Sequence, residues 1–151
     1  MSQTSFAAPI EPSVTIEEII ENFSFLEEWD DRYGYLIELG RSLVPLDEAE
    51  KNEENRVQGC VSQVWVVGNA DRSGDAPVLT FRGASDAHIV SGLVAIALTL
   101  FSGRTAEEIL ETDEQAVFAE IGLGEHLTPQ RANGLRSMVQ RLKAMAQTET
   151  A

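Results

Sequence analysis

The sequence has 151 residues, of which 25 are acidic and 11 basic, giving a formal net charge of −14. Nucleic acids and anionic membranes bind through clustered lysine and arginine, so this balance argues against both as main partners. It favours a partner protein with a basic surface, or it simply keeps the chain in solution. With 43% hydrophobic residues and no apolar run near the roughly 20 residues that cross a bilayer, the composition predicts one globular domain.

The two ends of the chain are predicted to add little to the fold. Residues 1–13 lack both a basic region and a long apolar stretch, so they indicate a disordered tail rather than a secretory signal. Residues 14–147 are expected to form a single domain, and residues 148–151 a frayed C-terminus. One cysteine excludes an internal disulfide, and with no export signal it predicts a reducing, cytoplasmic location.

Two helices are predicted first. Thr15 and Glu18 have the spacing of a capping box, and an apolar helical stripe follows them. A second helix over residues 27–42 stops before Pro45, because proline cannot continue a helix. Gly34 weakens this second helix, which predicts that something packs closely against it there.

A charged loop and a hairpin come next. Residues 47–56 are polar and have no apolar period, which predicts a mobile surface loop. Residues 61–67 are β-branched and aromatic, and residues 77–82 form a second such run that Gly83 closes, so an antiparallel hairpin is expected. Since an isolated hairpin is marginal, a third short strand near Val57, or helices on one face, must support it.

The second half of the chain is predicted to be helical. Residues 87–101 are apolar nearly all round, as in a central buried helix, and Asp86 is its candidate N-cap. Three further helix starts are indicated by capping residues at Thr105, Asp113 and Thr128. Helices, then strands, then helices predict an α+β fold, with a small antiparallel sheet of about three strands covered by several helices.

Cys60 is the candidate reactive residue. Gly59 before it allows a sharp turn, and a thiol on a bend at the mouth of a strand can reach a partner's reactive atom. Arg56 would lower the pKa of the thiol if its side chain folded back. The structural alternative stays open, because free cysteine is often a buried, inert residue.

Other side chains are candidates for supporting roles. His126, in a turn, is a better candidate than His88 for a Cys–His catalytic pair. Arg131 lies in the first turn of the last helix, where the helix dipole disfavours a cation. It is therefore expected either to have a binding task or to pair with Glu125. One cysteine and two scattered histidines do not have the spacing of a zinc site.

Four motifs carry a family resemblance. Residues 56–65, Arg-Val-Gln-Gly-Cys-Val-Ser-Gln-Val-Trp, resemble the active-site signature of the SufE/CsdE family of sulfur-acceptor proteins. Residues 35–40, 83–93 and 126–131 are similar to further family motifs in the same order, so the resemblance covers roughly residues 23–144. It implies an α+β fold like that of the IscU-type scaffold, with the cysteine at a loop tip.

The resemblance also implies a function. Cys60 would accept persulfide sulfur from a cysteine desulfurase of the SufS or CsdA type, stimulate that enzyme, and pass the sulfur on for iron–sulfur cluster assembly. Asp86 and Arg131 match family positions on the desulfurase-facing surface and around the cysteine, and His126 matches more weakly. Together with Arg56, they are the expected partner-binding residues. The chain would be a carrier rather than a stand-alone enzyme and would need no cofactor, since pyridoxal phosphate belongs to the desulfurase.

Two departures from the family and two rival functions remain. Ala84 stands where many family members carry an acidic residue, and Ala119 where some do, which bears on partner contacts rather than on sulfur chemistry. One rival is a thiol hydrolase or transferase that uses Cys60 with His126. The other is an acidic interaction module whose cysteine is structural.

Overall fold

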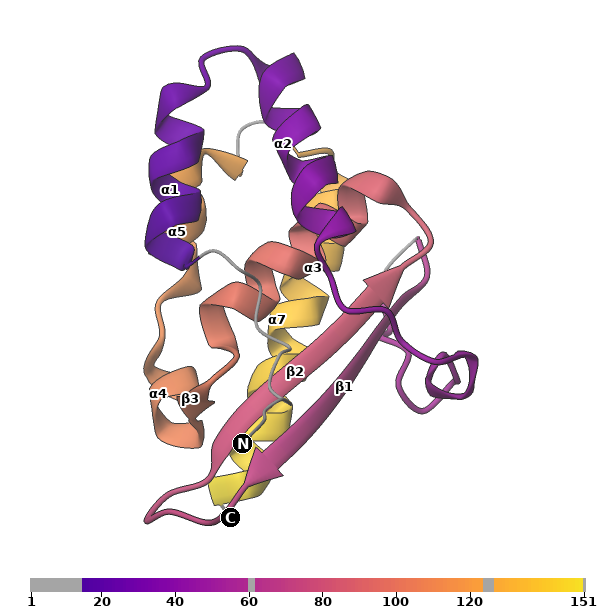
Figure 1. Cartoon of the computed structure of the whole chain (residues 1–151), viewed down its shortest axis with the longest axis vertical. Coiled ribbons are helices and arrows are strands. Elements are labelled where there is room, and N and C mark those ends of the chain that lie inside the picture. The colour runs from indigo at the N-terminus through magenta and orange to yellow at the C-terminus, as the bar shows by residue number, and fades with distance from the viewer. Residues whose placement is uncertain (1–14, 60–61, 124–126, 151) are drawn as a thin grey trace, which may run out of the picture.

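The computed structural model describes residues 15–59, 62–123 and 127–150 (Figure 1). Its sheet consists of β1 (Val64–Asp71), β2 (Val78–Ser85) and the short β3 (Arg104–Thr105). Among the described residues the strand order is β1-β2-β3, and both pairings are antiparallel. Helices α3 and α7 lie behind the long hairpin, and α1, α2, α4 and α5 surround them (Figure 1). The predicted α+β class with a small antiparallel sheet is confirmed.

The capping residues predicted from the sequence start several of the helices. Helix α1 (Ile16–Phe25) begins with a complete capping box, in which Thr15 and Glu18 bond each other's backbone N–H groups at 2.9 and 3.2 Å. A second box and an aspartate N-cap start α4 (Ala106–Glu111) and α5 (Glu114–Ile121). These starts could be predicted because each is a contact between residues three positions apart.

The last helix, α7 (Pro129–Thr150), is longer than expected. The Thr128 hydroxyl accepts from the Arg131 N–H at 3.2 Å, as the predicted cap requires. Fraying was predicted for residues 148–151, but the helix continues to Thr150 and Glu149 forms an ion pair with Arg72. The predicted tail, residues 1–13, lies outside the described residues.

Close packing of two helices builds the core, though not at the glycine expected. Helix α2 (Trp29–Arg41) crosses the buried helix α3 (His88–Phe101). A Cβ on Gly92 would lie 2.7 Å from the carbonyl carbon of Leu36, and one on Gly40 would lie 2.7 Å from the Ser91 Cβ. Gly34, where a close contact was predicted, has nothing within 4 Å of its Cβ position.

The strand limits also differ from the prediction. Strand β1 starts at Val64 rather than residue 61, and it continues through Gly68 to Asp71 instead of ending at residue 67. Strand β2 continues through Gly83 to Ser85. A Cβ on Gly68 would lie 3.1 Å from the Met145 Sδ, and one on Gly83 2.9 Å from the Val94 Cγ1. Both glycines therefore admit a helix close to the sheet instead of ending a strand.

A third strand was predicted near Val57. The third strand of the sheet is β3, on the far side of β2, but Arg56 forms an isolated antiparallel bridge with Trp65 of β1. The hairpin is thus supported on both edges. None of the helices that the structure describes has the length and apolar character needed to cross a membrane.

Adding one methyl group at the helix crossing should be costly. We expect Gly92→Ala to lower the free energy of unfolding by about 3 kcal/mol, because its Cβ would clash with the backbone of Leu36. Gly34→Ala is the matched control, since its site is open and alanine favours the helix by about 0.5–1 kcal/mol. Urea unfolding measures both variants. Equal stability of the two would contradict the close crossing of α2 and α3.

Candidate functional site

The loop that carries Cys60 is closed by a hydrogen bond between its two ends. The Val57 N–H donates to the Val64 carbonyl at 2.8 Å. We call residues 58–63, between these two valines, the Cys60 loop. Cys60 itself and the residue after it lie outside the described residues, so the site is built here from the residues that flank them and from the surfaces those residues contact.

Gly59, immediately before Cys60, lies close to helix α7. Its φ angle is +91°, in the region that L-residues with side chains rarely adopt, which confirms the predicted turn. A Cβ on Gly59 would also lie 2.5 Å from the Ser137 Oγ. Both the backbone angle and the space beside α7 therefore require glycine here.

Asp86 holds the other side of the Cys60 loop. Its carboxylate Oδ1 accepts from the Gln63 N–H at 3.1 Å, and its own N–H donates to the Gln63 carbonyl at 3.2 Å. The sequence assigned Asp86 to the N-cap of the buried helix. That assignment is wrong, because the N-cap is Ala87, whose N–H donates to the Ser85 hydroxyl.

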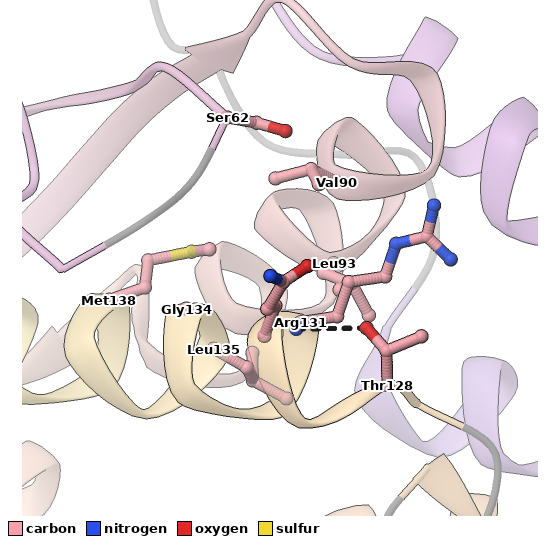
Figure 2. A pocket seen from close by; sticks show the side chains of 9 residues that line it. Ser62, Val90, Leu93, Thr128, Arg131, Gly134, Leu135 and Met138 are labelled. Carbon is pink, nitrogen blue, oxygen red and sulfur yellow. Dashed lines mark hydrogen bonds between the residues drawn. The ribbon is translucent and has the colours of Figure 1, made fainter.

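A cavity of about 280 Å³ opens beside the Cys60 loop, between α3 and α7 (Figure 2). Its walls are mainly apolar, and hydroxyl, amide and guanidinium groups complete its lining. The lining residues are Ser62, Val90, Leu93, Thr128, Gln130, Arg131, Gly134, Leu135 and Met138. In Figure 2 the side chains of Ser62 and Val90 lie across the cavity from those of α7. We call it the α3–α7 pocket.

Arg131 is the one basic residue among those that line this pocket, and in Figure 2 its guanidinium extends away from Ser62 and Met138. Its side chain is half-buried, and no ion pair or side-chain hydrogen bond joins its guanidinium to another described residue. Its backbone N–H is the one bonded to Thr128, shown dashed in Figure 2. The alternative partner, Glu125, lies outside the described residues. A half-buried cation without a carboxylate partner in the described chain suits an anionic ligand.

The segment before the Cys60 loop is fixed in place, contrary to the mobile loop predicted for residues 47–56. The turn η2 (Glu48–Glu50) lies within it. Both carboxylate oxygens of Glu50 accept from Arg82 of β2, at 3.0 and 2.5 Å. The Asn55 amide donates to the Glu50 carbonyl at 2.9 Å. Of the polar side chains that indicated a solvated loop, Glu50 bonds the segment to the sheet, and Asn55 bonds the segment to itself.

The other candidate residues are Arg56 and the two histidines. The Arg56 guanidinium pairs with Glu53 at 3.2 Å, while its backbone bridges β1. His126 lies outside the described residues, and His88 is exposed at the start of α3. In the described ranges, no three histidine, aspartate or glutamate side chains gather as metal ligands.

The sequence did not indicate the residues of α7 that contact the loop. From the sequence, Met138 fits only the apolar stripe of a helix, and Arg141 fits only the C-terminal half, where the helix dipole favours a cation. Yet Met138 lines the pocket, and Arg141 bonds the chain before the Cys60 loop. Helical spacing placed Met138 on the inner face, but no signal in the sequence could identify a partner 85 residues away for Arg141.

Comparison with known proteins shows to which family this chain belongs. Residues 17–146 match the family model described as "SufE: Fe-S metabolism associated domain". The chain belongs to the SufE family. The resemblance seen in the sequence is confirmed, and with it a role in iron–sulfur metabolism.

Relatives within the SufE family match nearly the whole chain. A SufE-like protein of Rhizobium meliloti (strain 1021) is 54% identical over 133 residues, covering 88% of this chain and 95% of the relative. A SufE-like protein of Rhizobium etli is 48% identical over 137 residues, covering 91% and 93%. The solution structure of a hypothetical protein from Thermus thermophilus shares the fold, with a TM-score of 0.66, 26% identity, and 89% and 95% coverage.

Removing the Asp86 carboxylate should loosen the Cys60 loop at Gln63. We expect Asp86→Ala to lower the free energy of unfolding by up to about 1 kcal/mol and to speed hydrogen exchange of the Gln63 amide, which loses its acceptor. Asp86→Asn keeps an oxygen at that position and should exchange much as the wild type does. Slow exchange at Gln63 in the alanine variant would contradict this role.

The Glu50–Arg82 ion pair should make stability depend on pH in the acid range. The hydrogen bond from Arg82 holds the pKa of Glu50 below its ordinary value of 4.5, so the pair stabilises the fold above pH 4.5 and the contribution disappears as pH falls below it. Glu50→Gln should therefore be less stable than the wild type at pH 7, and the difference should shrink towards pH 3.

Urea unfolding from pH 7 to pH 3 measures that difference. Glu48→Gln is the control, because the Glu48 side chain is 92% exposed and its ion pair with Lys51, at 3.4 Å, lies at the surface. A Glu50→Gln difference that stays constant with pH would show that the ion pair does not stabilise the segment before the Cys60 loop.

Proposed function

We propose that this SufE-family protein accepts persulfide sulfur on Cys60 from a pyridoxal-phosphate-dependent cysteine desulfurase and passes it on for iron–sulfur cluster assembly. The observation that carries the proposal is the α3–α7 pocket, which lies beside the Cys60 loop and combines apolar walls with the Arg131 cation. Family membership supports the same conclusion.

The proposed reaction is a thiol exchange with no net oxidation. The Cys60 thiolate attacks the outer sulfur of the donor's persulfide, a new sulfur–sulfur bond forms on Cys60, and the donor's own sulfur leaves as a thiolate with the electron pair of the broken bond. Thiolate fraction, access and the pKa of the leaving thiol set the rate of such exchanges. The carrier needs no cofactor for this step, since pyridoxal phosphate acts on the desulfurase.

The pocket suits the product of that reaction. A persulfide on Cys60 carries a terminal sulfur that ionises readily and is polarisable. A nearby cation favours the anion, while an apolar wall excludes water from it at some cost in desolvation. Val90, Leu93 and Met138 offer the apolar wall and Arg131 the charge. Shielding from solvent and reductant is what a carried persulfide requires.

Delivery and uptake require the sulfur to leave the pocket. Residues 47–57 are held by the Glu50–Arg82 pair and by the Val57–Val64 hydrogen bond. We therefore place the movement within the Cys60 loop rather than in the longer charged segment before it. Asp86, Arg131, His126 and Arg56 remain the proposed partner-facing residues, and a cytoplasmic location remains the proposed setting.

Sulfur transfer to Cys60 can be measured directly. Incubated with a cysteine desulfurase, pyridoxal phosphate and cysteine, the wild type should gain the mass of one sulfur atom on the peptide that contains Cys60. Cys60→Ser should bind the desulfurase in a pull-down but gain no sulfur and give no stimulation of desulfurase activity, since serine cannot form a persulfide.

Two results would refute the proposal. One is full persulfide acceptance by Cys60→Ser. The other is a wild type that gains no sulfur and leaves the desulfurase rate unchanged. Thioester or ester turnover by the wild type without any desulfurase would instead support the thiol hydrolase that uses Cys60 with His126.

A further inference from the structure

Helix α7 bonds the chain directly before the Cys60 loop through a single guanidinium group. Arg141 donates from Nη1 to the Arg56 carbonyl at 3.1 Å and from Nη2 to the Glu54 carbonyl at 2.6 Å. The two carbonyls would otherwise need water as a donor. A planar guanidinium can bond both at once, whereas a lysine ammonium on its flexible stem acts as a point charge.

The same short segment is bonded to β1 on its other side. The Val66 N–H donates to the Asn55 carbonyl at 2.9 Å, and the Val57 N–H donates to the Val64 carbonyl at 2.8 Å. Residues 54–57 therefore alternate their partners: 54 and 56 bond α7, and 55 and 57 bond β1. The base of the Cys60 loop is held between a helix and a strand that are far apart in sequence.

A second contact of α7 lies on the same face of the helix. Ser137 is four residues before Arg141, so the two side chains lie one turn apart on one face. Ser137 abuts Gly59, the residue next to Cys60. Consecutive turns of α7 thus contact the loop at its base and beside its reactive residue, while Met138 lines the pocket.

We propose that Arg141 is a positioning residue for Cys60: its two hydrogen bonds hold residues 54–56, the chain directly before the Cys60 loop, against α7, and this anchoring limits access to the thiol and the loss of a bound persulfide. The consequence for sulfur retention rests on the function proposed above, while the effect on access to the thiol does not. Arg141 complements Asp86, which holds the loop at its other end, at Gln63.

The test compares Arg141→Ala, Arg141→Lys and the control Arg136→Ala in the full chain. Arg136 lies on the same helix but is exposed, and its guanidinium donates to Asn133 on that helix. Three quantities are measured: the rate of Cys60 alkylation by iodoacetamide, hydrogen exchange at the Val57 and Val66 amides, and the half-life of the Cys60 persulfide in dithiothreitol after loading by a desulfurase.

We expect Arg141→Ala to raise the alkylation rate and both exchange rates about tenfold, equivalent to about 1.4 kcal/mol, and to shorten the persulfide half-life by a similar factor. Arg141→Lys should give a smaller change, because it retains the charge without the paired geometry. Arg136→Ala should match the wild type. If the alanine variant does not fold, the lysine variant decides by the same three measurements.

Two outcomes would overturn the proposal, and a third would separate it from the proposed function. Alkylation at the wild-type rate in both Arg141 variants would show that Arg141 does not control access to Cys60, even if amide exchange rises. An equal rise in Arg136→Ala would show a general effect of charge on α7. If Cys60 alkylation responds as expected but the wild type takes no sulfur from a desulfurase, the positioning role stands and the proposed function falls.

Discussion

The hydrogen bond from the Val57 N–H to the Val64 carbonyl is the constraint on which the site depends. It converts the sequence around the cysteine from an open connection into a closed loop with a defined base. Two residues of this loop contact other elements: Gly59 lies against α7, and the Gln63 N–H donates to Asp86. The described residues on either side of Cys60 are therefore both held by contacts with other elements of the fold.

Helix α7 serves both the pocket and the loop. Its first turns supply Arg131, Gly134 and Leu135 to the cavity. Its middle supplies Ser137 to the loop and Arg141 to the chain directly before the loop. Because one continuous helix makes both sets of contacts, the pocket and the base of the loop keep a fixed relation to each other. Under the function proposed above, this fixed relation would present the same pocket to the carried sulfur after each transfer.

The sequence predicted the features that depend on near neighbours and missed those that depend on distant ones. The caps at Thr15 and Asp113 and the turn at Gly59 follow from local chemistry. The strand ends could not be predicted at Gly68 and Gly83, because only the packed helices show why those glycines lie inside strands.

The same limit explains the errors near the site. Charged residues before Cys60 have the composition of a solvated loop, and nothing local reveals that Arg82 and Arg141 bond them from other elements. Asp86 precedes a helix, which is the usual position of a cap, but its carboxylate bonds Gln63 instead. The fold class and the family could be predicted; the partners of individual charges could not.

The backbone at Gly59 has a stereochemical consequence. A positive φ is disfavoured for L-residues but is the natural range of their mirror images, and the Cβ of a D-residue points away from the direction in which an L-residue would meet Ser137. A semisynthetic chain with D-alanine at this position would keep the bend while removing the conformational freedom of glycine. Changing the chirality at this Cα could thus show whether the site needs only the backbone bend at residue 59 or also the conformational freedom of glycine there.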